Sequence, residues 1–363
     1  MKIIINQPRA SYFVGGAEMI SLDHAINMLK LGNEVYFFTI NPKSIDLDYS
    51  MQFKKFYDNY SNKIHFVEIE QDNKIKSIYN IQPGEDRCRW NIESIFYNQQ
   101  LYNYIFYGKT KYDVIFSYYN LDAVFIPREL IDKNVLYLCG IPREQNDFQG
   151  SFLSAYDIVL AISKEVKESW KKYYNSEVKV LSTGVDCNKF TLKENSNNEE
   201  ITLLYVGRLI SRKNVDKIIC AFKKLSKKYK IKLIIVGDGP DRKRLEKKSK
   251  KCEFIGIVSD PENYYKKADI FVSPSEYGEG LQGTILEAMS CGLTIVATNT
   301  KINKKLLYNN GGFLVESNGE SIIDGIEKAI IANRSKISKR NRKYVLSNYN
   351  WEKKVEEILE AIK

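Results

Sequence analysis

Short apolar runs alternate with amphipathic stretches along the whole chain. The short runs are typical of buried strands, whereas the stretches between them place their apolar residues on one face of a helix. Strand-like runs lie at residues 2–6, 36–39, 157–163, 203–206, 234–236, 254–258 and 269–273. Strands that alternate with helices favour βαβ units and parallel sheets. The pattern therefore predicts an α/β fold in both halves of the chain.

The length of the chain, 363 residues, indicates two hydrophobic cores, because single cores stop growing beyond about 250–300 residues. A polar run without apolar periodicity, from Thr191 to Glu200, marks the boundary between the halves. We expect an N-terminal domain at residues 1–187, a hinge at 188–200, a C-terminal domain at 201–345, and a last helical segment at 346–363.

The stretch from Glu279 to Gly292 carries the most informative chemistry. It follows a strand-like run that ends at Ser273, and it predicts a glycine-containing loop, a helix N-terminus and a helix that Gly292 ends. Backbone N–H groups at a helix N-terminus favour an anion. Glu279 lies on the loop and Glu287 lies two turns later. Free N–H groups beside two carboxylates suit a ligand that is part phosphate and part polyol, such as a nucleotide sugar.

The full run, S-P-S-E-Y-G-E-G-L-Q-G-T-I-L-E-A-M-S-C-G, resembles the E-x7-E signature of retaining glycosyltransferases of family 4, which have two Rossmann-like domains in a GT-B fold. The resemblance implies transfer of a sugar from a nucleotide-diphosphate sugar to a glycan, lipid-linked or polysaccharide-precursor acceptor, with retention of anomeric configuration. It also implies an acceptor-side N-terminal domain, a donor-binding C-terminal domain, and a last helix, Trp351 to Ile362, that crosses back to the first domain.

Two further segments support the resemblance. Leu203 to Phe222 predicts a strand, a turn and a helix, and it is similar to the family's G-R-L-x-x-x-K-G turn, with Asn214 in place of the second glycine. Asparagine tolerates the left-handed backbone conformation, so this exchange is mild. Gly15-Gly16-Ala17-Glu18, between a strand and a helix, resembles the family's G-G-A-E loop.

The resemblance implies a donor site. Arg208 and Lys213 would grip the diphosphate, Glu279 would hold the sugar, and Glu287 would accept hydrogen bonds from the ribose. Glu279, Arg208 and Lys213 form the expected catalytic set. The whole expected donor-binding set is Gly15, Gly16, Gly207, Arg208, Lys213, Ile257, Glu279, Gly280, Leu281, Gln282, Gly283, Thr284 and Glu287. The cations and the helix N-terminus would stabilise the leaving diphosphate, so we expect no metal and no other cofactor.

The chain departs from the family on the acceptor side. Many relatives carry a His near the reaction centre in the first domain, whereas the comparable strand ends here, residues 116–120 and 138–144, contain none. Tyr118, Asn120, Arg143 and Glu144 are the residues expected to face the acceptor instead.

A metal site is an alternative that the sequence does not favour. Asp46-Leu47-Asp48 has the D-x-D form that metal-dependent glycosyltransferases of the other major fold use, but it has no second cluster of acids near it. The two His, His24 and His65, lack ligand spacing, and we interpret them as packing or surface residues. The six Cys are scattered, which indicates reduced thiols in the cytoplasm.

Charge is uneven along the chain. Residues 1–187 carry 21 Lys and Arg against 23 Asp and Glu, whereas residues 188–363 carry 34 against 22. A solvated helical face is the default reading of the basic excess, and an anionic membrane surface is the main alternative. Phe53 to Tyr60 mixes aromatics with lysines, which fits either interfacial insertion or core packing. No nucleic-acid-binding motif accompanies the charge.

No apolar run approaches the ~20 residues of a membrane span, and the N-terminal apolar run is too short for a signal peptide. We therefore expect a cytoplasmic protein that touches the inner face of the membrane only peripherally. Two other function classes remain open: an epimerase of nucleotide sugars with a similar architecture, and an inactive scaffold. The few His argue against the first, and the retained Arg208, Lys213, Glu279 and Glu287 argue against the second.

Overall fold

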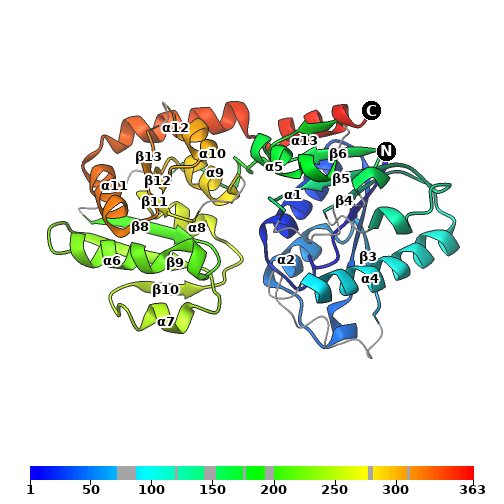
Figure 1. Ribbon diagram of the computed structural model, residues 1–363, viewed down its shortest axis with the longest axis horizontal. Coiled ribbons are helices and arrows are strands. Elements are labelled where there is room, and N and C mark those ends of the chain that lie inside the picture. Colours follow the sequence, from blue (N-terminus) through cyan, green and yellow to red (C-terminus); the bar gives the residue numbers. More distant parts are fainter. Residues whose placement is uncertain are drawn as a thin grey trace. The chain divides into compact units, whose positions relative to one another are not determined.

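The computed structural model describes residues 1–71, 87–118, 122–142, 153–174, 177–192, 200–276, 281–308 and 311–363, and for residues 87–93 and 123 it describes the backbone only. These residues form two compact units, one of residues 1–182 with 352–363, and one of residues 183–351. Each unit contains one parallel sheet with helices packed against it (Figure 1). The predicted α/β fold with parallel sheets is therefore confirmed.

The first unit is built on a seven-stranded sheet in the order β3-β2-β1-β4-β5-β6-β7. Its strands are β1 (Lys2–Asn6), β2 (Glu34–Ile40), β3 (His65–Ile69), β4 (Tyr112–Ser117), β5 (Ile131–Leu138), β6 (Ile158–Ala161) and β7 (Val178–Val180). Its helices are α1 (Gly16–Lys30), α2 (Met51–Tyr60), α4 (Arg87–Gly108) and α5 (Lys164–Trp170), with short 3-10 turns η1 (Pro42–Ile45), η3 (Asp122–Phe125) and η5 (Lys171–Tyr173).

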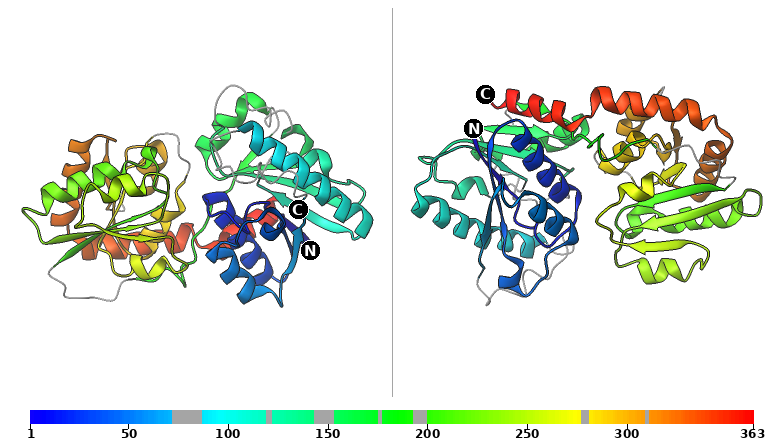
Figure 2. Two further views of the ribbon diagram at one scale, coloured as in Figure 1. Left: turned by 90° about the horizontal axis from the view of Figure 1, so that it is seen from below. Right: turned by 180° about the vertical axis from the view of Figure 1, so that it is seen from behind.

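The last helix, α13 (Trp351–Ala361), lies with the first unit, as the two further views show (Figure 2). The Lys133 ammonium on β5 donates to the backbone carbonyl of Ile362 at 2.6 Å, and that of Lys179 on β7 donates to the carbonyl of Ala361 at 2.9 Å. These bonds satisfy carbonyls at the end of α13 that have no partner within the helix.

The second unit is built on a six-stranded sheet in the order β10-β9-β8-β11-β12-β13. Its strands are β8 (Ile201–Val206), β9 (Ile231–Val236), β10 (Glu253–Gly256), β11 (Ile270–Ser273), β12 (Thr294–Thr298) and β13 (Phe313–Val315). Its helices are η6 (Ser211–Lys213), α6 (Val215–Leu225), α7 (Arg242–Glu246), α8 (Glu262–Tyr265), α9 (Gly283–Ser290), α10 (Lys301–Leu307), α11 (Gly319–Ile331) and α12 (Arg334–Asn348).

The central strand β8 divides the core of the second unit into two layers. Leu203 and Tyr205 pack into the cluster that contains α6 and α11, whereas Leu204 packs into the cluster that contains α9. Successive side chains of a strand point to opposite faces of the sheet, so the apolar run of β8 supplies both layers. Helices that cover both faces leave the strand ends as the accessible edge of the sheet.

The aromatic segment Phe53 to Tyr60 lies in α2 and contributes to the core of the first unit. The side chains of Phe53 and Phe56 are 1% and 4% exposed, and both rings contact Phe37 of β2 and Phe66 of β3. Of the two interpretations of this segment, core packing is therefore the one that the structure supports for these two rings.

Candidate functional site

The strand order of the second unit creates a topological switch point. β8 pairs with β9 on one side and with β11 on the other, and the helices that follow β8 and β11, α6 and α9, pack on opposite faces of the sheet. Ligands of open parallel sheets bind outside the carboxyl ends of the strands at such a point. The two motif segments predicted from the sequence, residues 207–214 and 279–287, follow these two strands.

The turn after β8 is shaped by contacts that admit no side chain. Gly207 has φ +154°, and a Cβ placed there would lie 2.9 Å from the Tyr205 hydroxyl, which donates to the carbonyl of Arg208 at 2.9 Å. A Cβ on Gly237, after β9, would lie 2.0 Å from the carbonyl oxygen of Gly207. Gly237 therefore lets the turns of β8 and β9 pack backbone against backbone.

Asn214 joins the two motif segments. It follows η6 with φ +54°, in the left-handed region, and its side chain is 3% exposed. Its Nδ2 donates to the carbonyl of Pro274, which follows β11, at 2.8 Å, and the amide of Glu276 donates to the carbonyl of Arg212 at 2.8 Å. The turn that carries Arg208 and Lys213 is thus tied to the start of the loop that leads to α9. Arg208 and Lys213 are both partly exposed there.

The N-terminus of α9 lies at the same edge of the sheet. Gln282 is the N-cap and makes no side-chain cap hydrogen bond; instead its Oε1 accepts from the Ser273 hydroxyl at 2.6 Å. A Cβ on Gly283 would meet no atom of the described residues within 4 Å. Thr284 is partly exposed, whereas Leu281 is 9% exposed and packs into the core.

Glu287 lies one turn further along α9 and is partly exposed. The Tyr265 hydroxyl donates to its Oε2 at 2.7 Å. Burial is the largest influence on the Glu287 carboxyl and raises its pKa, and the nearby Glu262 raises it further, whereas the Tyr265 hydrogen bond and the charge of Lys189 lower it. Tyr265, Lys189 and Glu262 were not among the residues predicted from the sequence, because nothing in their spacing connects them to Glu287.

The remaining predicted donor residues lie on other elements. Ile257 follows β10 directly and is 50% exposed. In the first unit, Gly15 is the N-cap of α1 in an extended conformation, and a Cβ there would lie 2.4 Å from Oε2 of Glu18. Gly15 therefore accommodates the buried Glu18 side chain, whereas a Cβ on Gly16 would meet nothing within 4 Å. Glu279 and Gly280 lie outside the described residues.

On the predicted acceptor side, only Tyr118 is described; Asn120, Arg143 and Glu144 lie outside the described residues. The Tyr118 side chain is 9% exposed and its hydroxyl lies 2.6 Å from Nδ1 of His24. His24 is fully buried, and burial lowers its pKa to about 3. The structure therefore places Tyr118 inside the unit, where it packs against a neutral imidazole.

The D-x-D tripeptide has a local structural explanation. Asp48 pairs with Lys43 at 2.5 Å, and Asp46 adopts the left-handed conformation that ends η1. Within the described ranges, no group of three or more His, Cys, Asp and Glu side chains could hold a metal ion.

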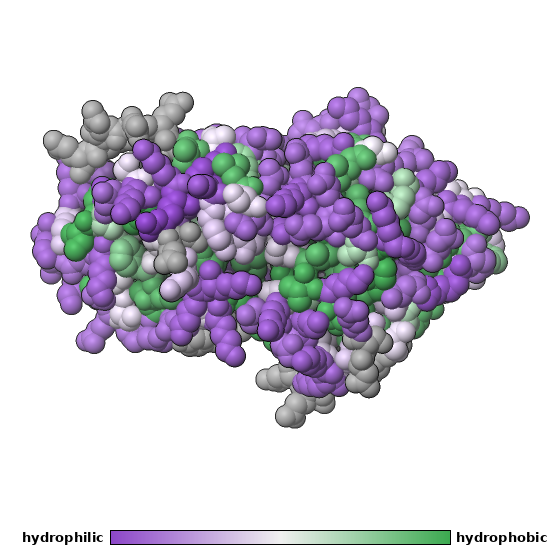
Figure 3. Space-filling model, turned by 90° about the horizontal axis from the view of Figure 1, so that it is seen from above, coloured by the Kyte–Doolittle hydropathy of each residue, from purple (hydrophilic) through white to green (hydrophobic). Residues whose placement is uncertain are grey.

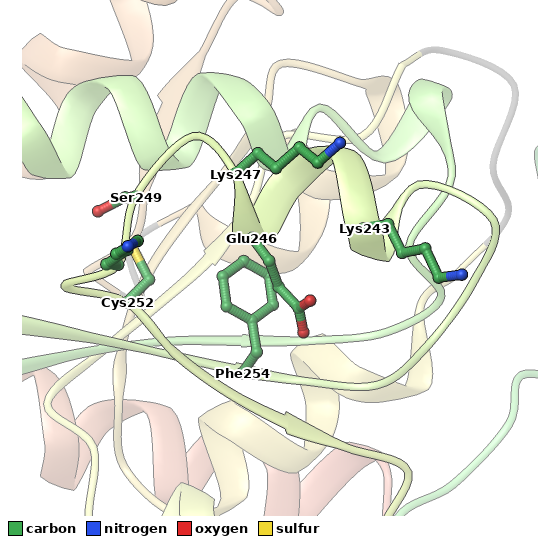
Figure 4. A pocket seen from close by; sticks show the side chains of 7 residues that line it. Lys243, Glu246, Lys247, Ser249, Cys252 and Phe254 are labelled. Atoms are coloured by element: carbon green, nitrogen blue, oxygen red, sulfur yellow. The ribbon is translucent and has the colours of Figure 1, made fainter.

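A separate pocket of about 600 Å³ lies away from these residues (Figure 4). Its lining residues are Lys243, Glu246, Lys247, Ser249, Lys250, Cys252 and Phe254. Cys252 and Phe254 lie at the amino end of β10, which in a parallel sheet is the edge opposite to the switch point. This pocket is therefore distinct from the candidate site.

Comparison with known proteins identifies the second unit. Residues 188–345 match the family model of group 1 glycosyl transferases. An uncharacterized glycosyltransferase of Methanocaldococcus jannaschii is 34% identical over 223 residues, which cover 55% of this chain and 57% of the relative. The chain spans about three fifths of the length of this relative and of two other uncharacterized glycosyltransferases, one from the same organism and one from Haemophilus influenzae.

The names of two relatives include the name of a lipid. One human subunit of phosphatidylinositol N-acetylglucosaminyltransferase is 31% identical over 167 residues, which cover 44% of this chain and 34% of the relative. The α-monoglucosyldiacylglycerol synthase of Streptococcus pneumoniae is 28% identical over 238 residues, which cover 58% of this chain and 54% of the relative.

Solved structures match the fold of the whole chain. Anabaena HepE in complex with UDP-glucose has a TM-score of 0.76 at 17% identity, with 100% of this chain and 99% of that chain covered. Sucrose-phosphate synthase from Thermosynechococcus elongatus has a TM-score of 0.77 at 17% identity, with 99% and 98% covered. The chain has the α/β fold of GT-B glycosyltransferases, with two parallel sheets.

Proposed function

We propose that the chain is a glycosyltransferase whose second unit binds a nucleotide-diphosphate sugar. The observation that carries this proposal is the junction at the switch point, where Asn214 ties the turn of Arg208 and Lys213 to the loop before α9. The group 1 glycosyl transferase domain at residues 188–345 supports it. The geometry gives one edge of one sheet a pair of cations, an open helix N-terminus and a carboxylate.

The leaving diphosphate would be stabilised by this edge. Negative charge grows on the diphosphate as the glycosidic bond breaks, and preorganised donors stabilise such charge without reorganisation. Arg208 offers a planar fork of donors, Lys213 a point charge, and the first amides of α9 the positive end of a helix dipole. Glu287 would accept hydrogen bonds from the ribose, and Glu279 would hold the sugar hydroxyls. This assignment requires no metal.

The finer mechanism is proposed from the resemblance to family 4. The sugar would keep its anomeric configuration, and the leaving phosphate would help to deprotonate the acceptor. The first unit would hold the acceptor, a glycan, a lipid-linked glycan or a polysaccharide precursor. The lipids in the names of two relatives support a lipid-linked acceptor.

A screen of nucleotide sugars tests this function. A ligand that binds only the folded protein raises its melting temperature, so UDP, GDP and ADP sugars are added singly to the full chain. One donor is expected to raise the melting temperature and to be hydrolysed slowly without an acceptor. Conversion of the donor to an epimer would identify an epimerase instead, and absence of any stabilisation by all three classes would contradict the proposal.

We also propose that the protein contacts the inner face of an anionic membrane peripherally. Three ammonium groups around the pocket of Figure 4, those of Lys243, Lys247 and Lys250, form no ion pair with any acid that the structure describes, whereas Arg242 and Arg244 nearby are paired. Hydrophilic residues are also frequent on the face drawn in Figure 3, which is the upper side of Figure 1, whereas α7 lies at the lower side. No helix among the described residues is long and apolar enough to span a bilayer. The three lysines would make this contact electrostatic.

Co-sedimentation with vesicles tests the membrane contact. Binding to vesicles that contain phosphatidylserine is expected at low salt and is expected to disappear at 1 M salt, where the screening length falls to about 3 Å. Replacing Lys243, Lys247 and Lys250 together by Gln should weaken binding, whereas neutral vesicles should bind neither form. Equal binding of both forms at low salt would remove this lysine cluster from the contact.

A further inference from the structure

The two carboxylate oxygens of Glu287 differ in their hydrogen bonding within the protein. Its Oε2 accepts the 2.7 Å hydrogen bond from Tyr265, whose own ring is fully buried between Phe190 and Phe271. Its Oε1 has no hydrogen-bond partner among the described residues, and it is not sealed from solvent. A carboxylate fixed through one oxygen presents the other at a defined position, which is the requirement for a specific hydrogen-bond acceptor.

Lys189 supplies the positive charge beside this carboxylate. Its ammonium lies 3.4 Å from Oε2 of Glu262, an oxygen that is buried and makes no hydrogen bond, and its charge also acts on Glu287. Lys189 therefore acts on two acids, and the position of its ammonium group influences how readily Glu287 loses its charge.

The backbone that carries Lys189 is held in place. The Arg342 guanidinium of α12 donates to the carbonyls of Cys187 at 2.8 Å and Phe190 at 2.5 Å, and also to the Ser290 hydroxyl of α9 at 2.6 Å. The Lys189 amide donates to the Asp186 carboxylate at 3.0 Å. A segment that is fixed on both sides of Lys189 restricts where its side chain can place the ammonium group.

We propose that Tyr265 and Lys189 are positioning residues that hold Glu287 as an oriented carboxylate, and that this carboxylate selects ribonucleotides over deoxyribonucleotides. The inference rests on the proposed nucleotide-sugar function and adds the residues that make ribose recognition possible. Neither Tyr265 nor Lys189 need touch the ligand. Their effect is expected on the ribose hydroxyls alone, and not on the base or the phosphates.

The charged and titratable groups that face Glu287 are Tyr265, Lys189, Glu262 and Cys291. The charge of Lys189 lowers the pKa of Glu287 and that of Glu262 raises it, so a variant without the Lys189 charge should have a Glu287 carboxyl of higher pKa than the wild type. When the solution is acidified, Glu287 of this variant would become protonated at a higher pH than Glu287 of the wild type. A neutral Lys189 variant should therefore lose its preference for ribose at a higher pH than the wild type does.

Binding to matched nucleotides tests the proposal. The probe is whichever of UDP, GDP and ADP stabilises the wild type, compared with its 2′-deoxy and 3′-deoxy forms by calorimetry. Hydrogen bonds to charged groups contribute about 1.5–3 kcal/mol, so wild type should prefer the ribonucleotide by about tenfold or more over one deoxy form. Tyr265→Phe and Lys189→Met should each reduce that ratio several-fold, and Lys189→Arg should restore it.

The chain offers a matched control. Glu327 accepts a hydrogen bond from the Tyr229 hydroxyl at 2.8 Å and one from the Lys228 ammonium at 2.7 Å. Tyr229→Phe and Lys228→Met therefore remove the same groups from a carboxylate on α11, and they should leave the ribose preference unchanged. In a Glu287→Ala background, Tyr265→Phe should have no further effect on the ratio.

The outcomes separate the inference from the function on which it rests. If no nucleoside diphosphate binds the wild type, both fail. If the diphosphate binds but the wild type does not discriminate against either deoxy form, or if Tyr265→Phe leaves the ratio intact, the positioning role is refuted and the proposed function stands. A lower ratio in Tyr265→Phe that persists unchanged in the Glu287→Ala background would also refute it, because the effect would not pass through Glu287.

Discussion

Asn214 is the residue whose departure from the family's glycine has a visible structural role. The sequence predicted that asparagine would tolerate the left-handed conformation, and φ is +54°. The structure adds a hydrogen bond from Nδ2 to the carbonyl of Pro274 at 2.8 Å, which glycine could not make. The exchange therefore keeps the backbone conformation and adds a tie between the turn after β8 and the segment after β11.

The tie should be measurable in the free energy of unfolding. Asn214→Gly keeps the backbone conformation but leaves the Pro274 carbonyl without this donor, which should destabilise the full chain by about 1–3 kcal/mol. Asn214→Ala should destabilise it by about 1 kcal/mol more, because alanine is strained at this φ. Urea unfolding of the three proteins measures both differences, and a glycine variant as stable as the wild type would show that the hydrogen bond contributes nothing.

Arg208 and Lys213 are each proposed to contact the diphosphate through a single side chain. Arg208→Ala and Lys213→Ala should each weaken binding of the nucleoside diphosphate by about 1.5–3 kcal/mol and leave nucleoside binding near the wild-type value. Arg244→Ala, which removes an exposed cation paired with Asp241, is the matched control. Calorimetry with both ligands gives the comparison, and equal losses for nucleoside and diphosphate would place the two residues away from the phosphates.

At the scale of elements, a buried carboxyl group, that of Asp122, connects several elements of the first unit. It lies near the switch point of the first sheet, where β1 pairs with β4. Asp122, at the start of η3, is 1% exposed and accepts hydrogen bonds from Asn6 of β1 at 2.7 Å, from Ser117 of β4 and from Tyr156. Tyr97 of α4 donates to Oδ1 of Asn6 at 2.8 Å. One carboxyl therefore connects two strands, a turn and the segment before β6, and through Asn6 it reaches α4.

The same carboxyl predicts a pH dependence of stability. Burial raises the pKa of Asp122 to about 6, against the opposing effect of its hydrogen bonds, whereas an unfolded Asp titrates near 3.9. Between these values the folded state binds the proton that the unfolded state has lost, so the contribution of Asp122 to stability is complete below about pH 4 and declines as the pH rises through about 6.

Asp122→Asn should therefore flatten the fall in the free energy of unfolding between about pH 4 and pH 6. Asp113→Asn, on β4 but partly exposed, is the control substitution. Urea unfolding at a series of pH values measures the slope, and identical slopes for wild type and Asp122→Asn would mean that the carboxyl does not retain its proton in the folded state.

At the scale of the whole molecule, the proposed reaction should proceed without a divalent ion. Arg208, Lys213 and the N-terminus of α9 are proposed to do the work of a metal at the diphosphate, and Asp48 of the D-x-D tripeptide pairs with Lys43. Transfer or donor hydrolysis should survive excess EDTA after dialysis. If EDTA abolished activity and manganese or magnesium restored it, the metal-free proposal would be contradicted, and Asp46 and Asp48 would be the candidate metal ligands.

The sequence by itself determined the layered fold and the chain positions of the candidate site. The alternation of apolar runs with amphipathic stretches predicted two parallel sheets, because strand and helix periodicities depend on neighbours only a few residues apart. The same local logic predicted the strand, loop and helix around Glu279 to Gly292, the stop at Gly292, which has φ +77°, and the conformation of Asn214.

Only the tertiary structure decided which residues meet. The pattern around Phe53 suited either interfacial insertion or core packing, and Tyr118 was expected to face the acceptor. Both side chains are buried, the first against other rings and the second against His24. Glu287 meets Tyr265, and Lys189 meets Glu262, across 22 and 73 positions of the chain. No periodicity extends over such separations, because these contacts are set by how the strands order themselves in the sheet and how the helices pack on it.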